Sequence, residues 1–112
     1  MNSEFFDEGQ FPRVALGGGD SSRRLIAFGG SLLLARQDFE AGAASGPHSH
    51  DEEQLSLCLS GAFLAEVEGV ARRLGPGDSF YAGKGVTHGA RCIEAGALLH
   101  SFTPQRAEYR KD

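Results

Sequence analysis

Residues 42 to 61 read Gly42-Ala-Ala-Ser-Gly-Pro-His48-Ser-His50-Asp-Glu-Glu-Gln54-Leu-Ser-Leu-Cys-Leu-Ser-Gly61. In a β-strand, side chains at i and i+2 point to the same side, and their Cα atoms lie about 6–7 Å apart. His48 and His50 can therefore direct two imidazoles at one metal ion. Gln54 stands at i+6 from His48 and keeps the same parity, so it is the predicted further ligand of that ion.

Three carboxylates between the second histidine and the glutamine are alternative ligands. A regular strand would point Glu53 to the opposite side. Asp51 and Glu52 are expected in the bend that precedes the strand. Gln54 is therefore preferred to all three carboxylates.

A second stretch supplies another imidazole. It reads Gly77-Asp-Ser-Phe-Tyr-Ala-Gly83-Lys-Gly85-Val-Thr-His88. A turn followed by a late histidine can bring His88 across a barrel to the same ion. The chain has four histidines, and three of them fall into this arrangement.

The rest of the chain consists of short apolar segments separated by turns rich in glycine, a pattern typical of an all-β sandwich or barrel. Ser60–Gly61 and Glu94-Ala95-Gly96 are predicted turns, and Glu68–Gly69 is a tight hairpin signal. Arg106 to Asp112 is expected to be a short helix or a disordered tail. The predicted strands are Leu25–Phe28, Leu32–Phe39, Gln54–Leu59, Ala62–Glu68, Val70–Leu74, Ser79–Tyr81, Ala90–Ile93 and Ala97–Phe102.

Alternation along the strand after residue 53 separates two faces. Gln54, Ser56 and Cys58 share one face, which we expect to line a pocket. The opposite face carries a row of leucines and is either a dimer surface or packed against a neighbouring strand or the N-terminal segment. Its members are Leu55, Leu57 and Leu59.

Composition limits the class of protein. A chain of 112 residues has room for one core, and a net charge of −4 without long basic runs argues against nucleic acid or an anionic membrane as partner. The N-terminus has no secretory signal pattern, and apolar runs such as Leu32 to Ala35 are too short to span a membrane. Cys58 and Cys92 are expected to be reduced thiols. A cytoplasmic protein is therefore predicted.

The two stretches resemble the motifs of the cupin superfamily. The first motif, Gly-x5-His-x-His-x3-Glu-x6-Gly, is matched throughout except that Gln54 replaces Glu. The second, Gly-x5-Pro-x-Gly-x2-His-x3-Asn, is matched by Gly77, Gly85 and His88, with Gly83 and Cys92 in place of Pro and Asn. The resemblance implies a single jelly-roll barrel, or double-stranded β-helix, over residues 16–106, after an N-terminal segment 1–15 and before a tail 107–112. It also implies metal ligation by His48, His50, Gln54 and His88.

Glutamine at the fourth ligand position is similar to the KdgF-like branch of small cupins, pectin-degradation proteins that act on unsaturated uronates. The run His100-Ser-Phe102-Thr-Pro104-Gln-Arg106 also resembles that branch. The resemblance implies a small anionic sugar acid as substrate, a homodimer, and catalytic roles for His100 and Arg106. His100 stands where the family has an acid–base Asp, and histidine can also transfer protons near neutral pH. The alternative for Arg106 is a solvated charge; Phe102 is either a substrate contact or a core residue.

The predicted ligand set has a chemical consequence. Three neutral imidazoles and a carboxamide leave the charge of a divalent ion uncompensated, which favours anionic oxygen ligands. Such donors suit Ni, Co, Fe, Zn or Cu, with Mn also feasible. Two other functions stay open: an Fe-dependent dioxygenase and a non-catalytic cupin that binds a small ligand.

Overall fold

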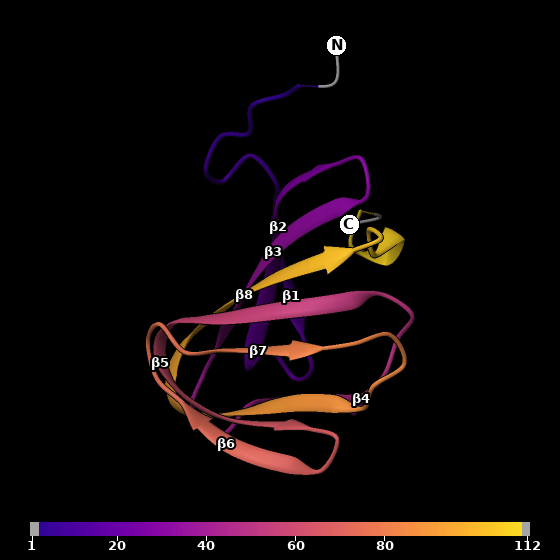
Figure 1. Cartoon of the computed structure of the whole chain (residues 1–112). Coiled ribbons are helices and arrows are strands. Elements are labelled where there is room, and N and C mark those ends of the chain that lie inside the picture. The colour runs from indigo at the N-terminus through magenta and orange to yellow at the C-terminus, as the bar shows by residue number, and fades with distance from the viewer. Residues whose placement is uncertain (1–2, 111–112) are drawn as a thin grey trace.

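Two long strands, β5 (Glu53–Val67) and β8 (His88–Thr103), organise the computed structural model, which describes residues 3–110 (Figure 1). They pair antiparallel along most of their length, and the register shifts between Cys58 and Phe63. The shorter elements are β1 (Arg13–Leu16), β2 (Ser21–Gly29), β3 (Leu32–Phe39), β4 (Ala44–His48), β6 (Val70–Leu74), β7 (Ser79–Ala82) and a 3-10 helix, η1 (Ala107–Arg110).

The register shifts divide β5 and β8 between two sheets. The first sheet runs β1-β2-β3, then the C-terminal half of β8, the N-terminal half of β5, and β7. The second contains β4, the N-terminal half of β8, the C-terminal half of β5, and β6. All pairs are antiparallel, so the described chain is an all-β jelly-roll barrel, as predicted.

The core between the sheets has two apolar clusters. In the larger, the Phe39 and Phe63 rings meet edge to face with centroids 5.1 Å apart. The smaller contains Leu33, Ala35 and Phe102. Because side chains alternate along a strand, these residues come from inward positions.

A buried polar layer separates the two clusters in the first sheet. Gln37 on β3, Ser56 on β5 and His100 on β8 are each at most 5% exposed. His100 is paired directly with Ser56, and Gln37 lies two residues along β3 from His100's partner Ala35. Three inward positions of adjacent strands therefore carry polar side chains, and on β3 and β8 the neighbouring inward positions are apolar.

Several strand boundaries differ from the sequence-based prediction. The predicted turns Ser60–Gly61 and Glu94-Ala95-Gly96 lie inside β5 and β8, because the ladder continues through irregular register there. At Gly61, with φ 78°, a Cβ would lie 2.5 Å from the carbonyl oxygens of Glu94 and Ala95. Residues 13–16 form a strand that was not predicted. The strand geometry expected for His48 and His50 holds only as far as His48. Residues 44–48 form a strand, and His50 lies in the connection before β5.

Other predictions about local structure are confirmed. The Glu68–Gly69 hairpin joins paired residues Val67 and Val70. Cys58 and Cys92 are free and buried. The alternation along β5 is also as predicted, with Gln54, Ser56 and Cys58 buried and the leucine row exposed.

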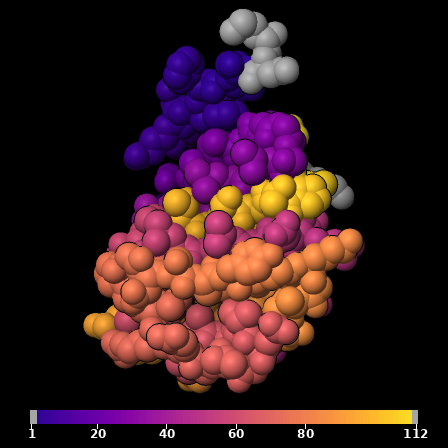
Figure 2. Space-filling model, viewed as in Figure 1, coloured from indigo at the N-terminus to yellow at the C-terminus, as the bar shows by residue number. Residues whose placement is uncertain are grey.

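Both chain ends pack beside β2. Phe6 and Phe11 lie against the Phe28 ring, with centroids 5.3 and 6.0 Å away, and the Arg110 guanidinium lies 3.7 Å from the same ring's centroid. In Figure 2 the indigo N-terminal segment projects from one end of the molecule, opposite β6. Residues 1, 2, 111 and 112, the outer ends of the predicted terminal segments, lie outside the described residues. Among the described residues, no helix has the length and apolar character needed to cross a membrane.

Candidate metal centre

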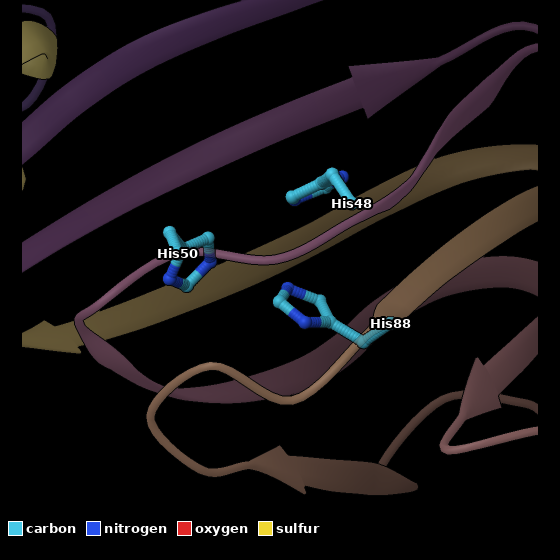
Figure 3. Close-up of side chains that lie close together, drawn as sticks. All are labelled: His48, His50 and His88. Atoms are coloured by element: carbon cyan, nitrogen blue, oxygen red, sulfur yellow. The ribbon is translucent and has the colours of Figure 1, made fainter.

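Three histidines converge at one end of the barrel. His48 ends β4, His50 follows in the connection to β5, and His88 begins β8 opposite His48. Figure 3 shows the three rings gathered between these segments. One ring nitrogen from each histidine lies within 4.8 Å of the others. The pairing of β4 with β8 thus joins two motifs that are far apart in sequence.

Backbone carbonyls fix the tautomers of two of these rings. His50 Nδ1 lies 2.9 Å from the Glu52 carbonyl oxygen, and His88 Nδ1 lies 2.8 Å from that of Val86. A carbonyl oxygen can only accept, so each Nδ1 carries the hydrogen and donates it. Each Nε2 is then left with a lone pair, as in a metal-ligating histidine whose other nitrogen is held by an outer partner.

The Gln54 side-chain oxygen faces these lone pairs. Its Oε1 lies 2.9 Å from His50 Nε2 and 3.0 Å from His88 Nε2. Three acceptor atoms at such distances repel one another unless a cation lies among them. The side chain is buried, with 5% exposure, so these atoms are shielded from bulk water. The donor set therefore fits a divalent metal ion held by nitrogen and oxygen ligands.

The surroundings of His48 and His88 favour the neutral imidazole, the form that binds metal. Burial, followed by the neighbouring His88 and His50, lowers the pKa of His48 to about 4. Burial is also the main cause that lowers the pKa of His88. A cavity of about 20 Å³ lies beside His48, Gln54 and His88, room for one water molecule or ion.

His100 lies next to this cluster and is not one of its three histidines. Its Nδ1 is 2.7 Å from Ser56 Oγ and 3.2 Å from Gln54 Nε2, and its Nε2 is 3.2 Å from Gln37 Oε1. Burial lowers the pKa of His100 to about 3. Both ring nitrogens thus have partners within the barrel, and the proton-transfer role expected for His100 stays a prediction.

Arg106 lies at the mouth of the barrel with its side chain 16% exposed. Its Nε is 3.6 Å from Glu52 Oε1, which is itself 3.4 Å from His50 Nδ1. It also forms an ion pair with Glu108. Arg106 is therefore linked to a candidate ligand through Glu52 and is not a freely solvated charge.

Aromatic rings close the site on the side of the C-terminal helix. Tyr109 packs edge to face on Phe102, with centroids 5.1 Å apart, and Tyr109 also lines the cavity. The Arg106 guanidinium lies 5.0 Å from the Tyr109 ring centroid and 5.5 Å from that of Phe102. Phe102 is 1% exposed and belongs to the core, so its predicted contact with substrate stays a prediction.

Four residues that surround the candidate metal centre were not predicted from the sequence to take part in it. Ser56 shares the inward parity of Gln54, a signal that was available. Gln37 breaks an apolar inward pattern on β3, and Glu52 was considered only as a ligand. Nothing in the sequence indicated that Tyr109 would return to the barrel, because that depends on tertiary packing.

A small jelly-roll barrel with three convergent histidines at one end defines a class of compact metal-binding β proteins. A profile of the cupin domain matches residues 35–100. The chain belongs to the cupin family. A search of curated proteins found no match.

Solved structures support this assignment. An RmlC-like cupin from Shewanella frigidimarina is similar, with 34% identity, a TM-score of 0.89, and coverage of 97% of this chain and 99% of that one. KdgF from Halomonas sp. has 30% identity, a TM-score of 0.88, and coverage of 95% and 97% respectively. A B. subtilis oxalate decarboxylase variant, at 18% identity and TM-score 0.80, covers 90% of this chain and 29% of its own; it shows only a shared fold. This chain is thus a small cupin that resembles KdgF.

Proposed function

We propose that this cupin is a metal-dependent enzyme acting on a small sugar acid of the unsaturated uronate class. The observation that carries the proposal is the convergence of Gln54 Oε1 with the unprotonated Nε2 atoms of His50 and His88. With His48, these residues would hold one divalent ion from the series Ni, Co, Fe, Zn, Cu or Mn. Bound there, the ion would supply Lewis-acid polarisation of a substrate oxygen.

Arg106 supports an anionic substrate. Guanidinium groups bind carboxylates through two parallel hydrogen bonds, and one of the present partners of Arg106, Glu108, has its side chain 58% exposed. A substrate carboxylate would replace Glu108, while Glu52 would keep the guanidinium beside His50. A sugar acid is much larger than the cavity of about 20 Å³, so most of the substrate would lie outside this cavity, on the side of Arg106.

The test is turnover of unsaturated uronates by metal-loaded protein, followed by the ultraviolet absorbance of the conjugated double bond. Loss of a charge-assisted bidentate contact should lower kcat/KM of Arg106→Ala by about 10- to 100-fold. Arg110→Ala, four residues further on at the end of η1 and directed at Phe28, is the matched control and should keep activity.

Two other results would replace the proposal. Turnover that consumes O₂ with iron bound would indicate a dioxygenase. Protection from unfolding by sugar acids, with no turnover under any loaded metal, would indicate a cupin that only binds its ligand. The homodimer and the cytoplasmic location expected from the sequence stay predictions.

A further inference from the structure

The polar layer in the first sheet forms a continuous hydrogen-bonded chain that ends on Gln54. Gln54 Nε2 lies 2.8 Å from Ser56 Oγ, which is 2.7 Å from His100 Nδ1. His100 Nε2 lies 3.2 Å from Gln37 Oε1. The four side chains come from β3, β5 and β8 and are all buried.

With the amides of Gln54 and Gln37 oriented as in the structure, donor and acceptor rules give one direction along this chain. The Gln54 amide nitrogen is only a donor, so Ser56 Oγ accepts from it, and His100 Nδ1, 3.2 Å from the same nitrogen, carries no hydrogen. The Ser56 hydroxyl then donates to His100 Nδ1. The remaining His100 hydrogen lies on Nε2 and is donated to Gln37 Oε1.

In this direction the chain holds the amide of Gln54. With its nitrogen bound to Ser56, its oxygen faces His50 and His88. Rotation of the amide by half a turn would place the oxygen beside Ser56 Oγ and His100 Nδ1. His100 would then have to carry its hydrogen on Nδ1, and Gln37 would have to turn its amide nitrogen toward His100 Nε2. The tautomer of His100 therefore distinguishes the two directions.

We propose that Ser56 and His100 are positioning residues that hold the Gln54 carbonyl oxygen toward the metal ligands. This inference rests on the proposed function, in which Gln54 is a ligand. It assigns His100 a role through its hydrogen-bonding geometry alone. Partners of this kind typically contribute about 10- to 100-fold to metal affinity.

The experiment titrates metal-free protein with Co(II), whose visible spectrum reports the ligand set. Ser56→Ala and His100→Leu should each weaken Co(II) binding by about 10- to 100-fold. Their spectra should shift toward that of Gln54→Ala. His100→Asn keeps an acceptor toward Ser56 and should recover most of the affinity. In the double variant Ser56→Ala/Gln54→Ala, the loss should not exceed that of Gln54→Ala alone.

Cys58→Ala is the matched control. Cys58 follows Ser56 on the same inward face of β5, and both residues are 1% exposed. It belongs to the apolar cluster, so Co(II) affinity and spectrum should stay at wild-type values. A Ser56→Ala protein with the affinity and spectrum of Cys58→Ala would overturn the positioning role.

A readout without metal separates this inference from the proposed function. Nitrogen-15 NMR of the metal-free protein should show the His100 Nε2–H tautomer, and an Nδ1–H tautomer would overturn the chain. Failure of the wild-type protein to bind Co(II), with the Nε2–H tautomer present, would overturn the proposed metal function and the role of Ser56 in it.

Discussion

Gly46 shows how tightly the backbone packs around the candidate ligands. It has φ 87°, and a Cβ there would lie 2.7 Å from both His48 Nδ1 and the carbonyl oxygen of His88. A side chain at this position must displace a histidine of the cluster or separate β4 from β8. Gly42, in the turn before β4, has φ 90° but nothing within 4 Å of its Cβ position.

This contrast gives a prediction for alanine substitutions. Both glycines adopt a conformation that disfavours alanine, but only Gly46→Ala adds a steric clash. We expect Gly46→Ala to cost about 1–3 kcal/mol more in free energy of unfolding than Gly42→Ala, and to weaken Co(II) binding. Urea unfolding and Co(II) titration of the two variants measure both effects. If Gly46→Ala and Gly42→Ala lost equal free energy of unfolding and equal Co(II) affinity, the space around His48 would not restrict the side chain at position 46.

Burial of neutral His100 predicts acid sensitivity of the metal-free protein. The pKa of His100 is lowered from 6.5 to about 3 in the folded chain. Between these values the unfolded chain binds a proton that the folded chain does not, so stability falls as pH falls below 6.5. Above that pH the group has no effect. Between these two pKa values, His100 lowers the free energy of unfolding by up to about 1.4 kcal/mol for each pH unit of acidification.

Urea unfolding in the presence of a chelator, from about pH 8 to about pH 5, measures this slope. The His100→Asn variant lacks this pH-dependent contribution. The difference in free energy of unfolding between the wild-type protein and the variant should therefore shrink as the pH falls. A difference that stays constant across the range would contradict the assignment of a neutral, buried His100.

At the scale of the element, β5 has an exposed apolar row on its outer face. Leu55, Leu57 and Leu59 are 56%, 36% and 38% exposed, and Tyr81 on β7, paired with Leu55, is 54% exposed. The alternative was that another segment covers these leucines, but among the described residues all three are exposed. A second copy of the chain is the remaining expectation for this face.

Leu57→Asp tests that expectation, because burying an unpaired carboxylate in an interface is unfavourable. We expect the wild-type protein to be a dimer in light scattering after size exclusion and the variant to be largely monomeric. Leu64→Asp, on the other half of β5 and 43% exposed, should stay dimeric. A monomeric wild-type protein would refute the dimer outright.

The same strand shows what sequence can predict and what it cannot. The period of two assigned the inner and outer faces of β5 correctly, because one face is buried and the other is not. The continuation of the strand through Ser60 and Gly61 was missed. Its cause is the close passage of β8 residues 94 and 95, a contact between segments distant in sequence.

At the scale of the whole molecule, spacing predicted the four side chains that the barrel brings together as candidate ligands. The motifs encode local geometry, since two histidines and Gln54 lie within one segment. The orienting chain could not be predicted in the same way. Gln37, Ser56 and His100 meet only because β3, β8 and β5 are adjacent in the sheet, and the sequence shows each as an isolated polar residue.

The proposed function and the positioning role of Ser56 and His100 both require one divalent metal ion bound by His48, His50, His88 and Gln54. Elemental analysis of the purified protein, with His48→Ala and Gln54→Ala measured beside it, tests this most directly. We expect about one equivalent of a transition metal in the wild-type protein, loss of the metal in His48→Ala, and weaker retention in Gln54→Ala. A wild-type protein that contains no metal and takes up none of Ni(II), Co(II) or Zn(II) on titration would contradict it.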